Sequence, residues 1–185
     1  MKKYQSYLIL IVITLAVFYV AWWILAQYQI TADYRRNISA LDSYIPYSLQ
    51  PEELEPYLME NGEVFMYVVN THERGTARFE SMMRGIIRRE EFLLPLVMYN
   101  TSTNPNQLLI KLKEVFDEQD NLDLIIPPAL LFIKDGVLID VINMRKNYIN
   151  SDNNILDLSQ PRRDLTAEDI RNFMRNYGML AIDEN

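Results

Sequence analysis

The side chains with the clearest chemical potential lie in one short stretch, where His72, Glu73 and Thr76 precede an amphipathic segment. His72 is the only histidine of the chain, and beside a carboxylate or hydroxyl it could act as a general base or as a pH-responsive contact. A partly exposed loop histidine is the alternative. No Ser or Cys nucleophile accompanies it, and one histidine among scattered carboxylates is a poor ligand set, so we predict no catalytic residue, metal or cofactor. The hydroxyls of Thr71 and Thr76 are expected to cap the following helix.

The composition excludes several classes of function. The chain of 185 residues contains no cysteine, which rules out thiolate catalysis, disulfide exchange and cysteine-ligated zinc by this chain alone. It carries 18 Lys and Arg against 25 Asp and Glu, a formal charge of −7. This acidic balance does not fit a nucleic-acid binder.

Strands and helices alternate around the His72 stretch. Apolar, β-branched runs predict strands, and the last two of these runs flank Lys134-Asp135-Gly136, a strong hairpin signal. Apolar residues at helical spacing predict the helices, and Thr166 with Asp169 resembles a capping box for the last one, which stops at Gly178. The expected elements are a short helix that starts at Pro51, a strand at 64–70, a helix at 76–89, a strand at 96–100, a helix at 108–118, strands at 129–133 and 137–142, and a helix from 166.

The N-terminal segment predicts that the protein is located in a membrane. Twenty residues from Tyr7 to Ala26 carry no charge, and a helix of that length spans a hydrocarbon core of roughly 30 Å. A cleaved signal peptide is the alternative, but its apolar region would be shorter and would end in small residues. We expect a cytoplasmic N-terminus at 1–6, an uncleaved transmembrane helix at 7–28, a juxtamembrane stalk at 29–50 and an extracytoplasmic domain at 51–185, oriented by Lys2 and Lys3.

Charged groups elsewhere in the chain can be interpreted either as solvated surface residues or as binding residues. Arg84, Arg88 and Arg89 can share one helix face and could meet anionic lipid, a polymer or an acidic partner, although solvation is the default. The acidic run at 117–123 lacks the glycine and terminal glutamate of an EF-hand, so a solvated loop is expected. The polar segment 145–164 is long for a passive loop.

The stretch from Ile126 to Gly136, Ile-Pro-Pro-Ala-Leu-Leu-Phe-Ile-Lys-Asp-Gly, resembles the proline strand and hairpin of the thioredoxin family. Together with the element order, it predicts an α/β thioredoxin-like fold, a mixed sheet flanked by helices. The anchor makes the chain most similar to membrane-anchored thioredoxin-like proteins of Gram-positive bacteria, including bacteriocin transport accessory proteins. The insertion at 145–164 departs from a minimal thioredoxin.

The resemblance implies a binding groove without its redox chemistry. The family's Cys-x-x-Cys falls on Glu73 to Thr76, and Pro128 would follow a cis peptide bond. The family binds extended peptides between this helix N-terminus and the cis-proline loop, but Pro127 has no N–H to donate to a peptide. The implied groove comprises His72, Glu73, Arg74, Gly75, Thr76, Pro127, Pro128 and Ala129.

Three functions remain open at this point. The first is a redox-inactive binding or assembly module for a secreted peptide, a transporter or an envelope complex at the membrane surface. The second is a non-thiol enzyme that uses His72, which would have to face a concave pocket with a carboxylate or hydroxyl within hydrogen-bond reach. The third is a structural subunit that acts through its transmembrane helix.

Overall fold

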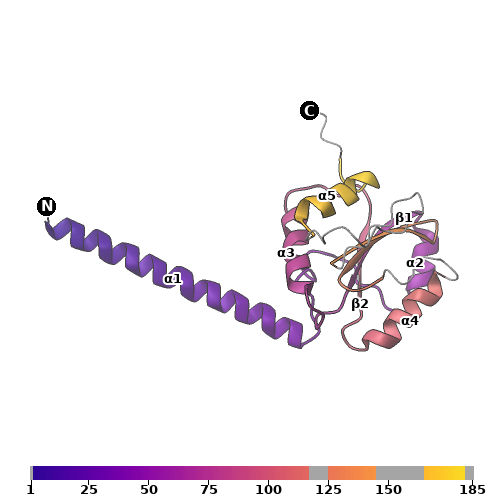
Figure 1. The fold of residues 1–185 in the computed structure, drawn as a ribbon, viewed down its shortest axis with the longest axis horizontal. Helices are drawn as coiled ribbons and strands as arrows, with labels where there is room; N and C mark the ends of the chain where they lie inside the picture. Colours follow the sequence, from indigo (N-terminus) through magenta and orange to yellow (C-terminus); the bar gives the residue numbers. More distant parts are fainter. Residues whose placement is uncertain (1, 117–124, 145–164, 182–185) are drawn as a thin grey trace, which may run out of the picture.

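A long helix and a compact α/β unit make up the chain. The structure, a computed structural model, describes residues 2–116, 125–144 and 165–181, so the predicted acidic loop at 117–123 and the segment 145–164 lie outside the described residues. Helix α1 (Lys2–Arg35) is continuous and projects away from the α/β unit (Figure 1). Residues Ile11–Arg35 are long and apolar enough to cross a membrane. The large apolar side chains from Ile11 to Tyr28 are 52–70% exposed, because no described part of the chain packs on them.

Four strands form a mixed sheet in the order β2-β1-β3-β4. The central strand β1 (Glu63–Val69) pairs parallel with β2 (Leu96–Asn100) and antiparallel with β3 (Ala129–Lys134). Strand β4 (Val137–Asn143) pairs antiparallel with β3. Asp135 and Gly136 connect β3 and β4 with φ values of 50° and 75°, the left-handed conformation that an Asp-Gly hairpin turn requires.

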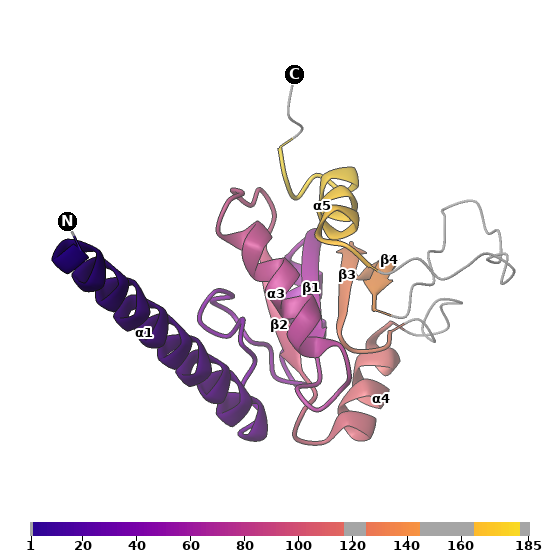
Figure 2. The same cartoon turned by 60° about the vertical axis from the view of Figure 1, so that its left-hand side comes forward.

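Helices cover both faces of the sheet (Figures 1 and 2). Helices α3 (Thr76–Ile87) and α5 (Ala167–Asn176) share one apolar cluster with the inward residues of β1, whereas α2 (Leu54–Glu60) and α4 (Pro105–Val115) contribute to the cluster on the opposite face. The alternating side-chain direction along β1 explains this division, because Phe65, Tyr67 and Val69 point to one face, the residues between them point to the other, and both sets are buried.

Helix ends differ from the predicted ones where local hydrogen bonds override the pattern. Helix α2 begins at Leu54, not at Pro51, since the Glu53 carboxylate accepts from the N–H of Gln50 at 2.8 Å and stabilises a turn there. Helix α4 begins at Pro105, three residues before the predicted start, with proline in its first turn.

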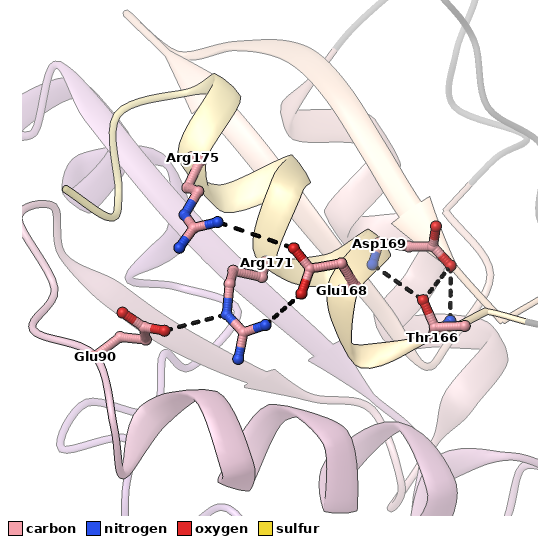
Figure 3. Close-up of polar contacts among 6 residues, drawn as sticks. All are labelled: Glu90, Thr166, Glu168, Asp169, Arg171 and Arg175. Carbon is pink, nitrogen blue, oxygen red and sulfur yellow. Dashed lines mark hydrogen bonds and ion pairs between the residues drawn. The ribbon is translucent and has the colours of Figure 1, made fainter. Parts of the chain in front are cut away.

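Helix α5 confirms the predicted capping box (Figure 3). Thr166 Oγ1 accepts from the N–H of Asp169 at 3.2 Å, and the Asp169 carboxylate accepts from the N–H of Thr166 at 2.7 Å. Arg171 then joins the helix to the end of α3 through Glu90, at 3.1 Å, and also contacts Glu168 (Figure 3). These contacts hold α5 beside α3.

Residues 39–50, which the sequence predicted as part of a stalk, are packed into the α/β unit. Leu41 and Ile45 are 0% and 2% exposed in the cluster beneath α3 and α5, and Leu49 is 2% exposed on the opposite face. The N–H of Leu49 donates to the carbonyl of Met98 at 2.8 Å, so this segment also extends the sheet beyond β2. Residues 39–50 therefore contribute to both apolar clusters of the α/β unit.

Candidate functional site

The turn between β1 and α3 carries the residues that the resemblance places at the lost cysteine motif. His72 and Arg74 are exposed, and Glu73 is half-exposed. Gly75 begins α3 with φ of 92°, a conformation that other residues rarely adopt. It is the N-cap, and as a glycine it has no side chain with which to cap the helix.

The prediction that Thr71 and Thr76 cap α3 is therefore wrong. Both hydroxyls donate to backbone carbonyl groups instead, Thr76 Oγ1 to Asn70 at 2.7 Å and Thr71 Oγ1 to Tyr34 at 3.1 Å. These bonds bind the turn to the end of β1 and to the end of α1.

The proline half of the predicted groove lies at the same edge of the sheet. The peptide bond between Pro127 and Pro128 is cis, as the resemblance implied, and Ala129 pairs with Val68 of β1. Pro127, Pro128 and Ala129 are all buried, however. The Met144 side chain at the end of β4 also lies against α3, since its Cγ would be 3.3 Å from a Cβ placed on Gly75. The structure thus places the β1–α3 turn and the cis-proline at the same end of the β1–β3 pair, with His72 and Arg74 exposed and Pro127, Pro128 and Ala129 buried.

His72 does not have the surroundings of a general base. Its Nε2 lies 2.7 Å from the amide Oδ1 of Asn37, just beyond α1, and the ring is exposed. Its partner is therefore an amide oxygen and not the carboxylate or hydroxyl that the enzyme hypothesis requires. Within the described residues, no group of three His, Asp or Glu side chains could hold a metal ion.

Glu80 forms a polar centre that the sequence analysis missed. This residue of α3 is 0% exposed, and its carboxylate accepts from Ser39 Oγ at 2.5 Å, the N–H of Ala40 at 3.0 Å, Tyr67 OH at 3.2 Å and Tyr34 OH. Four donors compensate for the burial of a carboxylate, which is otherwise costly. Burial, together with the neighbouring Glu80 carboxylate, raises the pKa of the Tyr67 phenol, which therefore stays a donor.

These donors come from three different elements. Tyr34 belongs to α1, Ser39 and Ala40 to the segment after it, and Tyr67 to β1. Asn100 at the end of β2 adds a further bond, from its Nδ2 to the carbonyl of Asn37 at 2.7 Å. The end of α1 is therefore fixed to the β1–α3 edge of the domain, which we call the junction (residues 34–40 with 71–72, 80 and 100). One signal in the sequence could have located it, because Glu80 interrupts the apolar face that includes Phe79 and Met83.

Comparisons with known proteins bear on the fold. No protein-family model and no curated protein matches the chain. Among solved structures, a chain described as "A putative oxidoreductase with a thioredoxin fold" is similar at 11% identity and a TM-score of 0.39, over 52% of this chain and 80% of that one.

The strand order, the parallel β1–β2 pair with its crossover helix, the β3–β4 hairpin and the cis-proline before β3 define a thioredoxin-like fold. The predicted fold class is confirmed, including an N-terminal apolar helix that is a candidate membrane span. The class is thus a thioredoxin-like domain without cysteine, joined to one long apolar helix.

Proposed function

We propose that this chain is a membrane-anchored binding or assembly module whose domain has the thioredoxin-like fold without its redox chemistry. The observation that carries the proposal is the combination of that fold with a total absence of cysteine. Thiol–disulfide exchange needs a thiolate, and Glu73 and Thr76 supply none. A domain of this fold that has no thiol chemistry can still act by binding another molecule.

The proposed contact surface is the exposed β1–α3 turn. His72 and Arg74 project there from a backbone that the Thr71, Thr76 and Asn37 bonds hold in place. The turn adjoins the end of α1, so a partner at this surface would itself lie at the membrane. A protein or peptide with an acidic or hydrogen-bonding segment suits the imidazole and guanidinium groups. We propose that α1 remains uncleaved, with the domain outside the cell.

Site-specific photocrosslinking in native membranes tests this proposal. A photoreactive residue at Arg74 should give a discrete protein adduct, whereas one at Asn106, exposed on α4, should give none. Replacement of residues 7–28 by leucine should leave the Arg74 adduct intact. Silence at Arg74 would refute the binding surface, and loss of the adduct in the leucine variant would favour the hypothesis that the helix itself makes the contact.

A further inference from the structure

Some of the described arginines form ion pairs, and others form none. On α5, both Arg171 and Arg175 pair with Glu168, and Lys111 and Lys134 also have carboxylate partners. Within the described ranges, no ion pair involves the arginines at the end of α1 or along the last half of α3. These unpaired arginines are Arg35, Arg36, Arg84, Arg88 and Arg89.

Contacts with the segment after α1 place two of these arginines, Arg84 and Arg88, and Arg35 and Arg36 come directly before that segment in the chain. Loops of residues 37–50 lie between α1 and α3 in Figure 2. Arg84 Nη2 donates to the carbonyl of Ala40 at 3.4 Å, and the guanidinium carbons of Arg84 and Arg88 lie 5.8 Å and 5.3 Å from the Tyr44 ring centroid. An arginine over an aromatic ring keeps its full charge, so these contacts position the cations without neutralising them.

The end of α1 sets where these arginines would lie relative to a bilayer. If the apolar part of α1 fills the hydrocarbon, Tyr28 lies at the interface and Arg35 and Arg36 lie among the headgroups. The Glu80 bonds fix α3 to this same end of α1, and Arg84 and Arg88 contact Ala40 and Tyr44 in the segment that follows α1. Asp33 and Asp42 belong to the same region, and neither forms an ion pair with these arginines. These arginines therefore have the charge and the position to meet lipid headgroups.

We propose that these residues, which we call the arginine face (Arg35, Arg36, Arg84, Arg88 and Arg89), dock the domain on anionic lipid headgroups. The inference rests on the proposed insertion of α1 in a bilayer and adds a second attachment, of the domain itself. Two attachments of different kinds, one apolar and one electrostatic, give a domain of fixed orientation rather than a tethered one.

The absence of native cysteine makes the test direct, because one introduced cysteine carries the only spin label. The full chain is reconstituted in nanodiscs of phosphatidylcholine, with or without phosphatidylglycerol, that contain a lipid with a nickel-chelating headgroup. The label is placed by Ser81→Cys, on the exposed side of α3, and in a control by Asn106→Cys on α4. Collisional broadening by nickel should appear for the Ser81 label only in anionic discs, and the Asn106 label should stay unbroadened.

Charge variants then identify the groups responsible. Arg89→Gln removes an exposed guanidinium that forms no hydrogen bond or ion pair with the described residues, so the substitution should leave the folded domain intact. The docking equilibrium should weaken about fivefold for each arginine removed near an anionic surface, and further as salt is raised. Lys111→Gln, on the opposite side of the sheet, should leave it unchanged.

Each remaining outcome overturns the proposal. Equal broadening in neutral discs would show that charge does not dock the domain. No broadening in either disc, with the chain incorporated, would refute the docking and leave the anchor standing, whereas failure to incorporate would refute both. Shielding of the Ser81 label in native membranes but not in anionic discs would assign the face to a protein partner.

Discussion

Glu80 shows what one buried carboxylate can organise at the scale of a single residue. Its partners are hydroxyls and a backbone N–H, so its charge is held by hydrogen bonds and not by a cation. Removal of the charge leaves buried donors without an acceptor, which costs more than the net value of the bonds themselves.

Glu80→Gln should therefore lower the free energy of unfolding by roughly 2–3 kcal/mol, because the new amide group turns a donor toward Ala40 or Tyr34. The measurement is denaturant unfolding of the full chain in detergent micelles, followed by near-UV circular dichroism. The same substitution at the exposed Glu114 of α4 is the control, with an expected change within about 0.5 kcal/mol. Equal effects at both positions would contradict a role for the Glu80 bonds.

Asp140 on β4 provides a pH-dependent prediction. Burial raises the pKa of its carboxyl, although hydrogen bonds from Tyr177 OH at 2.6 Å and the N–H of Val141 at 2.7 Å oppose the shift. Between the unfolded pKa of roughly 3.9 and the raised pKa of the folded protein, the native state binds more protons than the unfolded state. The free energy of unfolding therefore decreases as pH rises between these two pKa values.

Asp140→Asn should remove this part of the pH dependence. The difference in unfolding free energy between the native chain and the variant should change most between about pH 4 and the raised pKa, and stay constant above it. Urea titrations at several pH values measure this difference. A difference independent of pH would show that the native carboxyl titrates normally.

Single elements were predictable where local chemistry decides them. The apolar runs of β1 and β2, the Asp135-Gly136 turn and the Thr166 cap each carry their own signal, and each appears in the structure. Residues 39–50 carry only a weak signal, because Leu41, Ile45 and Leu49 recur every four residues in a segment without helical structure. Their burial depends on distant strands, which a local pattern does not report.

The candidate site was predictable only in part, for the same reason. The resemblance to the thioredoxin family implied that the β1–α3 turn and the cis-proline lie at one end of the sheet, and the structure has the cis peptide bond before Pro128. The sequence did not predict that Pro127 and Pro128 would be buried, nor that Asn37 would contact His72, because these contacts join segments far apart in the chain. Glu80 was missed because its hydrogen-bond donors come from other segments of the chain, and the pattern of α3 alone does not indicate them.

On helix α5, the contribution of an N-cap to the free energy of unfolding can be measured separately from that of an ion pair. Thr166→Ala should lower the free energy of unfolding by about 1 kcal/mol at any ionic strength, because the lost bonds join a neutral hydroxyl to the N–H and the carboxylate of Asp169 and no ion pair is broken. Arg171→Ala should cost less than about 1 kcal/mol, and less still in high salt. Denaturant titrations at low and high salt provide both values, with Thr103→Ala, exposed before α4, as the control. A salt-dependent loss in the Thr166 variant would contradict the assignment.

At the scale of the whole molecule, the packing of residues 39–50 predicts where the chain can be divided. A fragment of residues 29–185 keeps Leu41, Ile45, Leu49 and all four Glu80 donors, whereas one of residues 51–185 loses those three apolar residues and keeps Tyr67 as the only one of the four donors. Each buried Leu or Ile contributes about 1.5–3 kcal/mol, and domains are stable by only about 5–15 kcal/mol in total.

We therefore expect the fragment 29–185 to fold and the fragment 51–185 to lack a cooperative unfolding transition. Amide proton dispersion in NMR spectra, together with thermal melts, distinguishes the two. A well-dispersed spectrum from residues 51–185 would show that the earlier segment is dispensable, and would restore the predicted domain boundary.

Residues 36–38 are the whole distance between the helix and the first buried residue of the domain, Ser39, and Asn37 turns the chain there with φ of 62°. A long flexible linker would let a membrane-anchored domain take many orientations and bind partners at many heights above the bilayer. With α1 inserted in a bilayer, as we propose, a connection this short, fastened at Glu80 and His72, would confine the domain to a thin layer at the membrane, where it would meet partners by lateral diffusion in two dimensions. The short connection would then set the height above the bilayer at which a partner must present its own contact surface.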